Sequence, residues 1–393
     1  MNVIKRVIGV LAILLIARSA AAAPFGIEAR SLAMGNVSVV TSDIATAAFA
    51  NPAMLAFQRS DDDFSLLLPS VGLYLDDSDA MIDQIDAYQA ESAAYDAAVA
   101  AANAPAAATA ANNMLTIAQG MSGKVISPQL SGAVALGVAG ETYSFALSAR
   151  SDIVLAGGLR NIATNSAQAV DPLFNRLFLV GVQTTEVGVS IARNFELFGS
   201  KVSVGITPKN VGVEGLFIDQ SLATVDNSIS GITKEDAIVD LGSFTTMDAG
   251  IAVGLTDNIQ VGAIIRNILT EDLPINTPAF TGVLKFETQT RAGIAYNGDF
   301  FTLGADLDLT ENNSQIIPGD KSRLFSAGAE FNAFDFMQLR VGMQKNIAGG
   351  IPSKAKDPLL TAGIGLWLGF HIDASVISGN DILGAYIQTG FKF

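Results

Sequence analysis

The chain has no cysteine, one histidine, one tryptophan and few charged residues, which make up 16% of its 393 residues. Without cysteine it cannot form a disulfide, carry lipid on a cysteine or use a thiolate as nucleophile or metal ligand. The net charge of −15 argues against nucleic acid as a partner, because phosphate binding needs clustered lysine and arginine. Solvated acidic loops are the simpler explanation of this charge.

Long apolar runs are also missing after the N-terminus, although 50% of the residues are hydrophobic. The uncharged stretch 97–123 is long enough to span a membrane as a helix, but it is rich in alanine and interrupted by Pro105. An apolar, weakly charged chain without apolar helices favours a transmembrane β-barrel, in which outward apolar residues alternate with inward polar ones.

The N-terminus has the three parts of a secretion signal. Lys5 and Arg6 precede an apolar core at 7–16, and Ala20-Ala21-Ala22 offers a small-residue cleavage site. We therefore expect residues 1–22 to be a cleaved signal peptide, with an uncleaved membrane anchor as the alternative. Together with a barrel, this predicts the outer membrane of a Gram-negative bacterium, with its lipid as a contact.

The segment that follows, residues 23–60, differs from the rest of the chain and is called the hatch below. Thr41-Ser42-Asp43 and Asn51-Pro52 are helix-start signals, so short helices are expected at 43–49 and 52–57. Two such helices would form a compact plug. The alternative is an ordinary helical turn on a soluble domain.

A helical insertion is expected at 78–120, capped by Ser78 or Asp79 and broken at Pro105. One mostly apolar seam recurs at helical spacing through Met81, Ile85, Tyr88, Ser92, Tyr95, Val99 and Ala102. The insertion is either a cap over a barrel mouth or a helical hairpin packed on itself.

From Gln129 onward the pattern alternates with a period of two. In 301–309, Phe301, Leu303 and Leu307 share one face, and Thr302 and Asp306 lie on the other. A soluble sandwich would also alternate. About fourteen strands are expected, however, joined by tight turns that alternate with long loops, and this is typical of an outer-membrane barrel over residues 61–393. The strands are expected near 64–75, 129–139, 142–157, 178–193, 200–213, 241–255, 258–268, 284–296, 300–310, 322–332, 336–346, 358–367, 370–377 and 382–393.

The inward face is expected to be polar. Its predicted members are Lys285, Glu287, Arg291, Asp306, Asp308, Glu330, Arg340 and His371. Two carboxylates of 306–308 with Glu330 could coordinate a hard cation, but a charge ladder opposite Arg291 and Arg340 is the commoner arrangement. His371 and Asp373 are too far apart along a strand for a catalytic relay. We therefore expect no enzyme activity, metal or cofactor.

Several motifs resemble one known family. The mature start reads Ala29-Arg30-Ser31 with Ala33-Met34-Gly35, followed by Asn51-Pro52-Ala53, and the first strand contains Leu67-Leu68-Pro69-Ser70. In front of about fourteen strands, these resemble the FadL superfamily of outer-membrane transporters and, more closely, its TraF-like conjugal-transfer branch. The resemblance implies that the hatch fills the lumen and that Asn51, Pro52 and Ala53 form its motif. The helical insertion departs from fatty-acid transporters. Pro69 is a candidate strand kink.

The chain ends on Phe393, which resembles the C-terminal signal read by the barrel-insertion machinery; Gln388 stands where that signal usually has glycine. The expected function is passive uptake of small hydrophobic or amphipathic molecules through a plugged barrel. The alternative is a non-enzymatic envelope component that anchors or assembles a transfer or secretion apparatus. An apolar pocket near the hatch would favour transport, whereas a lumen filled by charge ladders would suit an anchor.

Overall fold

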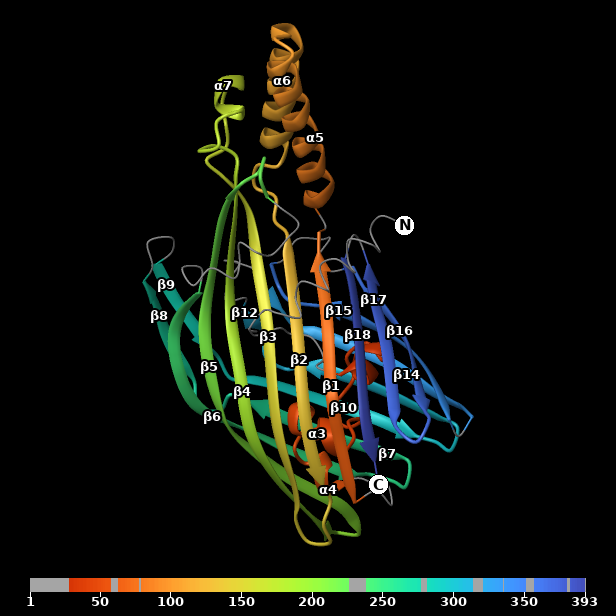
Figure 1. The fold of residues 1–393 in the computed structure, drawn as a ribbon. Coiled ribbons are helices and arrows are strands. Elements are labelled where there is room, and N and C mark those ends of the chain that lie inside the picture. The colour runs from red at the N-terminus through yellow and green to blue at the C-terminus, as the bar shows by residue number, and fades with distance from the viewer. Residues whose placement is uncertain are drawn as a thin grey trace.

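A closed antiparallel barrel of fourteen strands forms the body of the molecule (Figure 1). The computed structural model describes residues 28–57, 63–77, 79–225, 238–276, 281–313, 321–334, 336–350, 357–379 and 382–392. Consecutive wall strands pair along the chain, and β1 closes the ring by pairing with β18. The predicted fold is therefore confirmed. The predicted signal peptide, residues 1–22, and Phe393 lie outside the described residues.

The strand boundaries follow the prediction closely near the C-terminus and less closely in the middle. The wall consists of β1 (Phe64–Asp76), β2 (Ser127–Val138), β3 (Ser144–Arg160), β4 (Arg176–Leu197), β5 (Ser200–Ser221), β6 (Ile238–Gly254), β7 (Ile259–Arg266), β10 (Gln289–Asn297), β11 (Phe301–Asp308), β14 (Leu324–Phe334), β15 (Met337–Asn346), β16 (Leu359–Trp367), β17 (His371–Gly379) and β18 (Ile382–Lys392). Strands β3, β4 and β5 extend beyond the expected ranges, where Arg160 and Arg176 both pair with Asp219 and tie them together.

Side chains alternate between the outside of the wall and its lumen. In β11, Phe301 and Leu303 are exposed, whereas Thr302 and Asp306 are buried. The exposed face is thus the apolar one, the reverse of a soluble sandwich, because the outer surface of such a barrel meets lipid. Among the described residues, no helix is long and apolar enough to span a bilayer.

The two ends of the barrel differ. Short turns join the strands at the end where the C-terminus lies, the short-turn end, and longer connections gather at the opposite loop end (Figure 1). Helices α3 and α4 lie at the level of the short-turn half. Helices α5, α6 and α7 project beyond the loop end (Figure 1).

The hatch contains three short helices, α2 (Ala29–Ala33), α3 (Ile44–Ala50) and α4 (Met54–Phe57). Asp43 caps α3 in a capping box: its Oδ1 accepts from the Thr46 N–H at 3.1 Å, and the Asp43 N–H donates to Thr46 Oγ1. Helix α2 was not expected from the sequence, because it is only five residues long and no side chain caps it.

The insertion after β1 is a helical hairpin, α5 (Met81–Ala100) and α6 (Ala104–Gly120), with α7 (Ser166–Ala169) beside it; together we call them the turret. Asp77, rather than the expected Asp79, caps α5 by accepting from the Met81 and Ile82 N–H groups. Ser78, the other expected cap, lies outside the described residues. Helix α5 ends in a Schellman motif, in which the Asn103 N–H donates to the Ala98 carbonyl. Pro105 lies in the first turn of α6, where proline is favourable.

The expected strand 284–296 is wrong at its first residues. A separate hairpin, β8 (Glu271–Asn276) and β9 (Thr281–Phe286), precedes β10, and a two-residue pair, β12 (Asn312–Asn313) and β13 (Lys321–Ser322), follows β11. Lys285 therefore lies on the hairpin, where its side chain is 60% exposed and pairs with Asp272, and not in the lumen. Glu287 is also exposed and accepts from Asn313 Nδ2 at 3.0 Å. The period of two is the same in a hairpin and in a wall, so the pattern could not separate them.

An apolar cluster occupies the inward face of the wall toward the loop end. On β5 and β6 this cluster includes Val211, Val213 and Phe244. They lie on the same inward face that contacts the hatch nearer the short-turn end. The hairpin contributes Leu273, Ile275, Leu284 and Phe286, and the rings of Phe244 and Phe286 lie 4.8 Å apart.

Candidate functional site

A belt of inward glycines surrounds the hatch. At each position a Cβ atom would lie within 3 Å of a hatch atom, so only glycine leaves enough room for the hatch. The belt runs through Gly137, Gly205, Gly250, Gly262, Gly293, Gly304, Gly328, Gly342 and Gly363, which lie on nine different wall strands. The hatch is therefore seated by close backbone approach around much of the ring.

One part of the belt holds the turn after α2. A Cβ on Gly342 would lie 2.2 Å from the Met34 carbonyl carbon and the Gly35 nitrogen, and one on Gly328 would lie 2.2 Å from the Met34 oxygen. Gly35 has φ +73°, which favours glycine, and a Cβ there would lie 2.3 Å from the Met343 oxygen. Thr361 Oγ1 adds two bonds, accepting from the Gly35 N–H and donating to the Ala33 carbonyl, both at 2.9 Å.

The Asn51-Pro52-Ala53 motif joins the hatch to β5 and β6. The fully buried Asn51 donates from Nδ2 to the Val39 carbonyl at 2.9 Å and to the Ile251 carbonyl at 3.2 Å. Its Oδ1 accepts from the Ala53 N–H at 3.1 Å. The backbone of Pro52 fills the space above Gly205. The motif thus folds the hatch and anchors it to the wall at once.

An ion-pair network lies between the hatch and β14–β17. Arg30 Nε donates to Glu330 Oε2 at 2.7 Å, and Arg340 Nε donates to the same atom at 2.6 Å. Arg340 also pairs with Asp373. Arg30 further donates to the Thr41 carbonyl, so one arginine links two parts of the hatch to the wall. This is the charge-ladder arrangement rather than a cation site.

A second group of polar contacts ties the hatch to β10 and β11. Asp306 accepts from the N–H groups of Ser38 and Val39 at 2.7 and 3.1 Å. Arg291 pairs with Asp308 at 2.6 Å and donates to the Asn36 carbonyl. Across the described ranges, no group of three acidic or histidine side chains could hold a metal ion.

Two hatch carboxyls have shifted pKa values. Burial raises the pKa of Glu28 to about 7, and the nearby Asp43 charge adds to this. Within the described residues, the Glu28 Oε2 atom has no hydrogen-bond partner. Burial alone would also raise the pKa of Asp43, but its ion pair with Lys392 at 2.8 Å, helped by Arg30, holds that pKa well below its usual range.

A polar cavity of about 270 Å³ lies between the hatch and the β18–β1 wall. Hatch residues Arg30, Asp43 and Thr46 line one side. The wall contributes Ser65 to Leu67 of β1 and residues 388–392 of β18, and His371 closes it, its ring 4.4 Å from that of Trp367.

The wall beside this cavity is irregular. Strand β1 shifts register between Leu67 and Ser70 against both β18 and β2, so Leu68 and Pro69 have no ladder partner on either side. One extra residue in β1 forms a bulge at the same place in both pairings, and proline cannot donate to a ladder. The bulge at Pro69 therefore borders the cavity through Leu66 and Leu67.

The structure brings most of the predicted polar residues together at the hatch. Those with contacts to it, to one another or to the cavity are Arg291, Asp306, Asp308, Glu330, Arg340 and His371. Sequence reasoning missed the glycine belt and Glu28. The glycines on the inward faces of the strands could be seen in the sequence. Their role in making room for the hatch could not be predicted, because it depends on which strands lie against the hatch.

Comparison with known proteins agrees with this architecture. The family described as "F plasmid transfer operon, TraF, protein" matches residues 48–308, which is more than half of the chain. No curated protein sequence matches the chain at a significant level.

Solved barrels resemble it in fold. The Ralstonia pickettii toluene transporter TbuX is 14% identical with a TM-score of 0.50, covering 94% of this chain and 98% of that one. A TodX deltaS2S3 mutant, a monoaromatic hydrocarbon channel, is 14% identical with a TM-score of 0.52 and coverages of 94% and 99%. A Pseudomonas aeruginosa FadL homologue is 11% identical with a TM-score of 0.51 and coverages of 92% and 97%. The chain therefore belongs to the TraF family named above and has the fold of FadL-type outer-membrane barrels.

Proposed function

We propose that this protein is a non-enzymatic, gated outer-membrane channel that admits small amphipathic molecules from the loop end, outside the cell. The short-turn end would face the periplasm, as in other outer-membrane barrels. The expected signal peptide and the FadL-type fold support this location. The structural likeness to hydrocarbon channels, at 14% identity, supports the fold alone. The proposed class of cargo therefore rests on this chain's own residues.

One observation carries the proposal: the wall bulge at Pro69 borders the cavity beneath the hatch. An amphipathic cargo suits this geometry, because charged side chains from both the hatch and the wall line the cavity, and the bulge in β1 lies next to it. The volume of about 270 Å³ favours a small cargo or the polar end of a longer one. By the test given above, the polar cavity and the charge ladders at the hatch suit an anchor. Transport is supported by the apolar cluster toward the loop end, which would receive the apolar part of the cargo first.

Passage requires the hatch to shift. The partly buried Arg30 pairs with the buried Glu330, which also pairs with the buried Arg340. The glycine belt holds residues 33–53 against the wall. The seated hatch is therefore the closed state in this proposal. Cargo would leave sideways past Leu68 and Pro69 rather than straight through the lumen.

Deleting Pro69 tests the route. Removal of one residue gives β1 a continuous register with β18 and β2 at once, because the shift is one residue in both pairings. We expect the variant to fold at least as stably, and uptake of a fluorescent fatty acid into liposomes to fall to the level without protein. Unchanged uptake would contradict the lateral route, and absence of uptake by the unaltered protein would contradict the channel.

Filling the cavity gives an independent test. Ser65 is buried in β1 and lines the cavity, so Ser65→Phe should reduce uptake. Ser151→Phe is the matched control, because Ser151 pairs in register with outward-facing Gly132 and contacts Thr185 on the exposed face. Saturable binding lost only in the Ser65 variant would support the cavity as the cargo site. Equal effects of both changes would argue against it.

A further inference from the structure

The turret leaves part of its apolar seam uncovered. Near the barrel, Met81 and Tyr88 of α5 are buried against Met114 and Met121, and Tyr88 Oη donates to the Ala169 carbonyl at 2.7 Å. Farther out the seam continues, but Val99 is 55% exposed. The sequence pattern thus extends an apolar face beyond the part that the hairpin itself buries.

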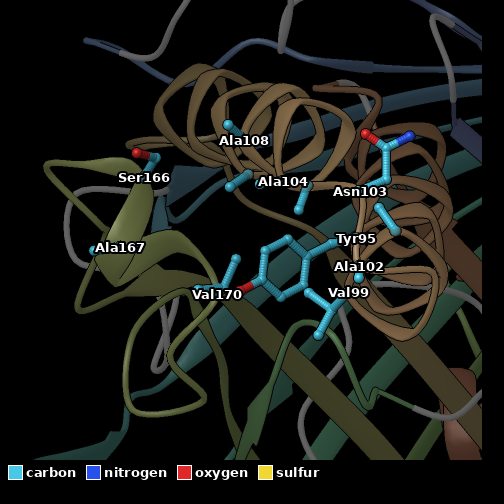
Figure 2. Close-up of a pocket in the computed structure, with 12 residues that line it drawn as sticks. Tyr95, Val99, Ala102, Asn103, Ala104, Ala108, Ser166, Ala167 and Val170 are labelled. Atoms are coloured by element: carbon cyan, nitrogen blue, oxygen red, sulfur yellow. The ribbon is translucent and has the colours of Figure 1, made fainter.

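This uncovered end forms a groove between α5, α6 and α7 (Figure 2). Its volume is about 550 Å³. Tyr95, Val99 and Val170 supply the larger apolar side chains, and the rest of the surface is mostly alanine, including Ala104 and Ala108 (Figure 2). Because alanine side chains are small, the backbone of a bound ligand can approach the surface of the groove closely. The groove lies on the part of the molecule farthest from the barrel wall (Figure 1).

The charge around the groove has one sign. Neither the segment 61–123, which contains α5 and α6, nor the segment 161–175, which contains α7, has any lysine, arginine or histidine. They carry Asp83, Asp86, Glu91, Asp96 and Asp171 among other acidic residues. Asp96 is exposed on α5, directly after Tyr95 of the groove. An apolar trough within an acidic surface is complementary to a ligand with one apolar and one basic face.

We propose that this groove docks a basic amphipathic helix of a partner protein outside the cell. Helix-in-groove binding uses apolar anchors about one turn apart, and Tyr95, Val99 and Ala102 offer contacts at that spacing. The acidic surface excludes nucleic acid and other polyanions, because like charges repel them. The proposal is independent of transport through the barrel.

The test uses the full mature protein in nanodiscs and a fluorescent helical peptide of about 15 residues, with a leucine–alanine face and a lysine face. We expect saturable binding that weakens with added salt. Ala108→Trp, which fills the groove, and Asp96→Lys, which reverses the nearest charge, should each weaken binding about tenfold or more. The matched control is Ala93→Trp, an exposed alanine of α5 that does not line the groove, and it should leave binding unchanged.

Several outcomes would overturn the proposal. A peptide with glutamate in place of lysine that binds equally well would show that charge complementarity has no role. Equal losses in the Ala93 and Ala108 variants would place the peptide elsewhere on the turret. Direct binding of a small neutral hydrophobic compound, with no binding of the basic peptide, would make the groove a small-molecule site. No saturable binding at low salt would also contradict it.

Discussion

The hatch and the turret are both helical, but the three hatch helices have 4 to 7 residues each, whereas α5 and α6 of the turret have 20 and 17. The hatch is buried on all sides and held by a glycine belt, backbone hydrogen bonds and buried ion pairs. The turret is anchored only at its base and leaves an apolar groove open at its tip. A hatch enclosed by the wall must match the shape of the wall closely. An exposed hairpin is stabilised by the apolar side chains packed between its own two helices. This difference suits the proposed roles, closure for the hatch and outward contact for the turret.

The largest expected loss of stability comes from adding a side chain at a glycine of the belt. Gly342→Val places a side chain where the backbone of Met34 and Gly35 lies, so we expect the hatch to be unseated or stability to fall by more than about 4 kcal/mol. Limited proteolysis of the hatch and thermal unfolding measure this. Gly212→Ala is the control, because its Cβ would be 3.9 Å from the nearest atom. Deleting the hatch should restore the Gly342 variant's barrel; a normally seated hatch would contradict the belt.

Removing the central carboxylate should have the next largest effect. Glu330→Gln leaves the guanidinium groups of Arg30 and Arg340 without their shared counterion, at a cost of about 3–5 kcal/mol. Urea unfolding measures it. Glu287→Gln removes an exposed carboxylate away from the hatch, and its effect should stay within about 0.5 kcal/mol. Similar midpoints for the two variants would argue against a structural network.

Lowering the pH should stabilise the seated hatch through protonation of Glu28. Because burial raises its pKa to about 7, the neutral form is favoured in the folded protein, and its stabilisation is present below the ordinary glutamate pKa and lost as pH rises through 7. Asp43 acts in the opposite sense, since its lowered pKa makes its contribution disappear on acidification below the usual aspartate range. Glu28→Gln should abolish the change in hatch protease resistance between about pH 5 and 8. A dependence that persists would assign it to another group.

A smaller loss is expected at the hatch motif. Asn51→Ala removes three hydrogen bonds and leaves buried carbonyls of Val39 and Ile251 without this donor, so we expect a cost of about 2–3 kcal/mol. Hydrogen exchange of residues 33–57 should rise while that of the wall does not. Uniform exchange across the barrel would mean that the motif stabilises the whole fold rather than seating the hatch.

The smallest expected change in stability is a gain, and it lies in the turret. Ala102 has φ +51° at the end of α5, a conformation that costs alanine about 1 kcal/mol relative to glycine. Ala102→Gly should therefore raise the local stability of the hairpin, measured by hydrogen exchange of α5 and α6. Ala93→Gly in mid-helix should lower it by about 0.5–1 kcal/mol. The same sign for both would contradict the left-handed cap.

The sequence predicted the wall well because alternation reports directly on a strand with lipid on one face. Residues 301–308 and 337–346 match the expected ranges almost residue by residue. It also located α3 through the Asp43 cap. These features depend only on neighbours along the chain.

What the sequence could not predict depends on contacts between distant segments. The β8–β9 hairpin has the same period as the wall, so Lys285 was assigned to the wrong surface. Gly342 looks like a weak point in a strand until the register places it opposite Met34. The pKa of the Glu28 carboxyl is raised by burial and by the nearby Asp43 charge, and both depend on the folded hatch.

Covalent locking of the hatch tests the central claim most directly, and the absence of cysteine makes one engineered pair unambiguous. A Cβ on Gly363 would lie 2.5 Å from Ala33 Cβ, so Ala33→Cys with Gly363→Cys can form a disulfide after a shift of about 1 Å. We predict that fatty-acid uptake into liposomes stops in the oxidised protein and returns on reduction, whereas each single-cysteine variant gives the same uptake under oxidising and reducing conditions. Equal uptake in both states would contradict a hatch that must move.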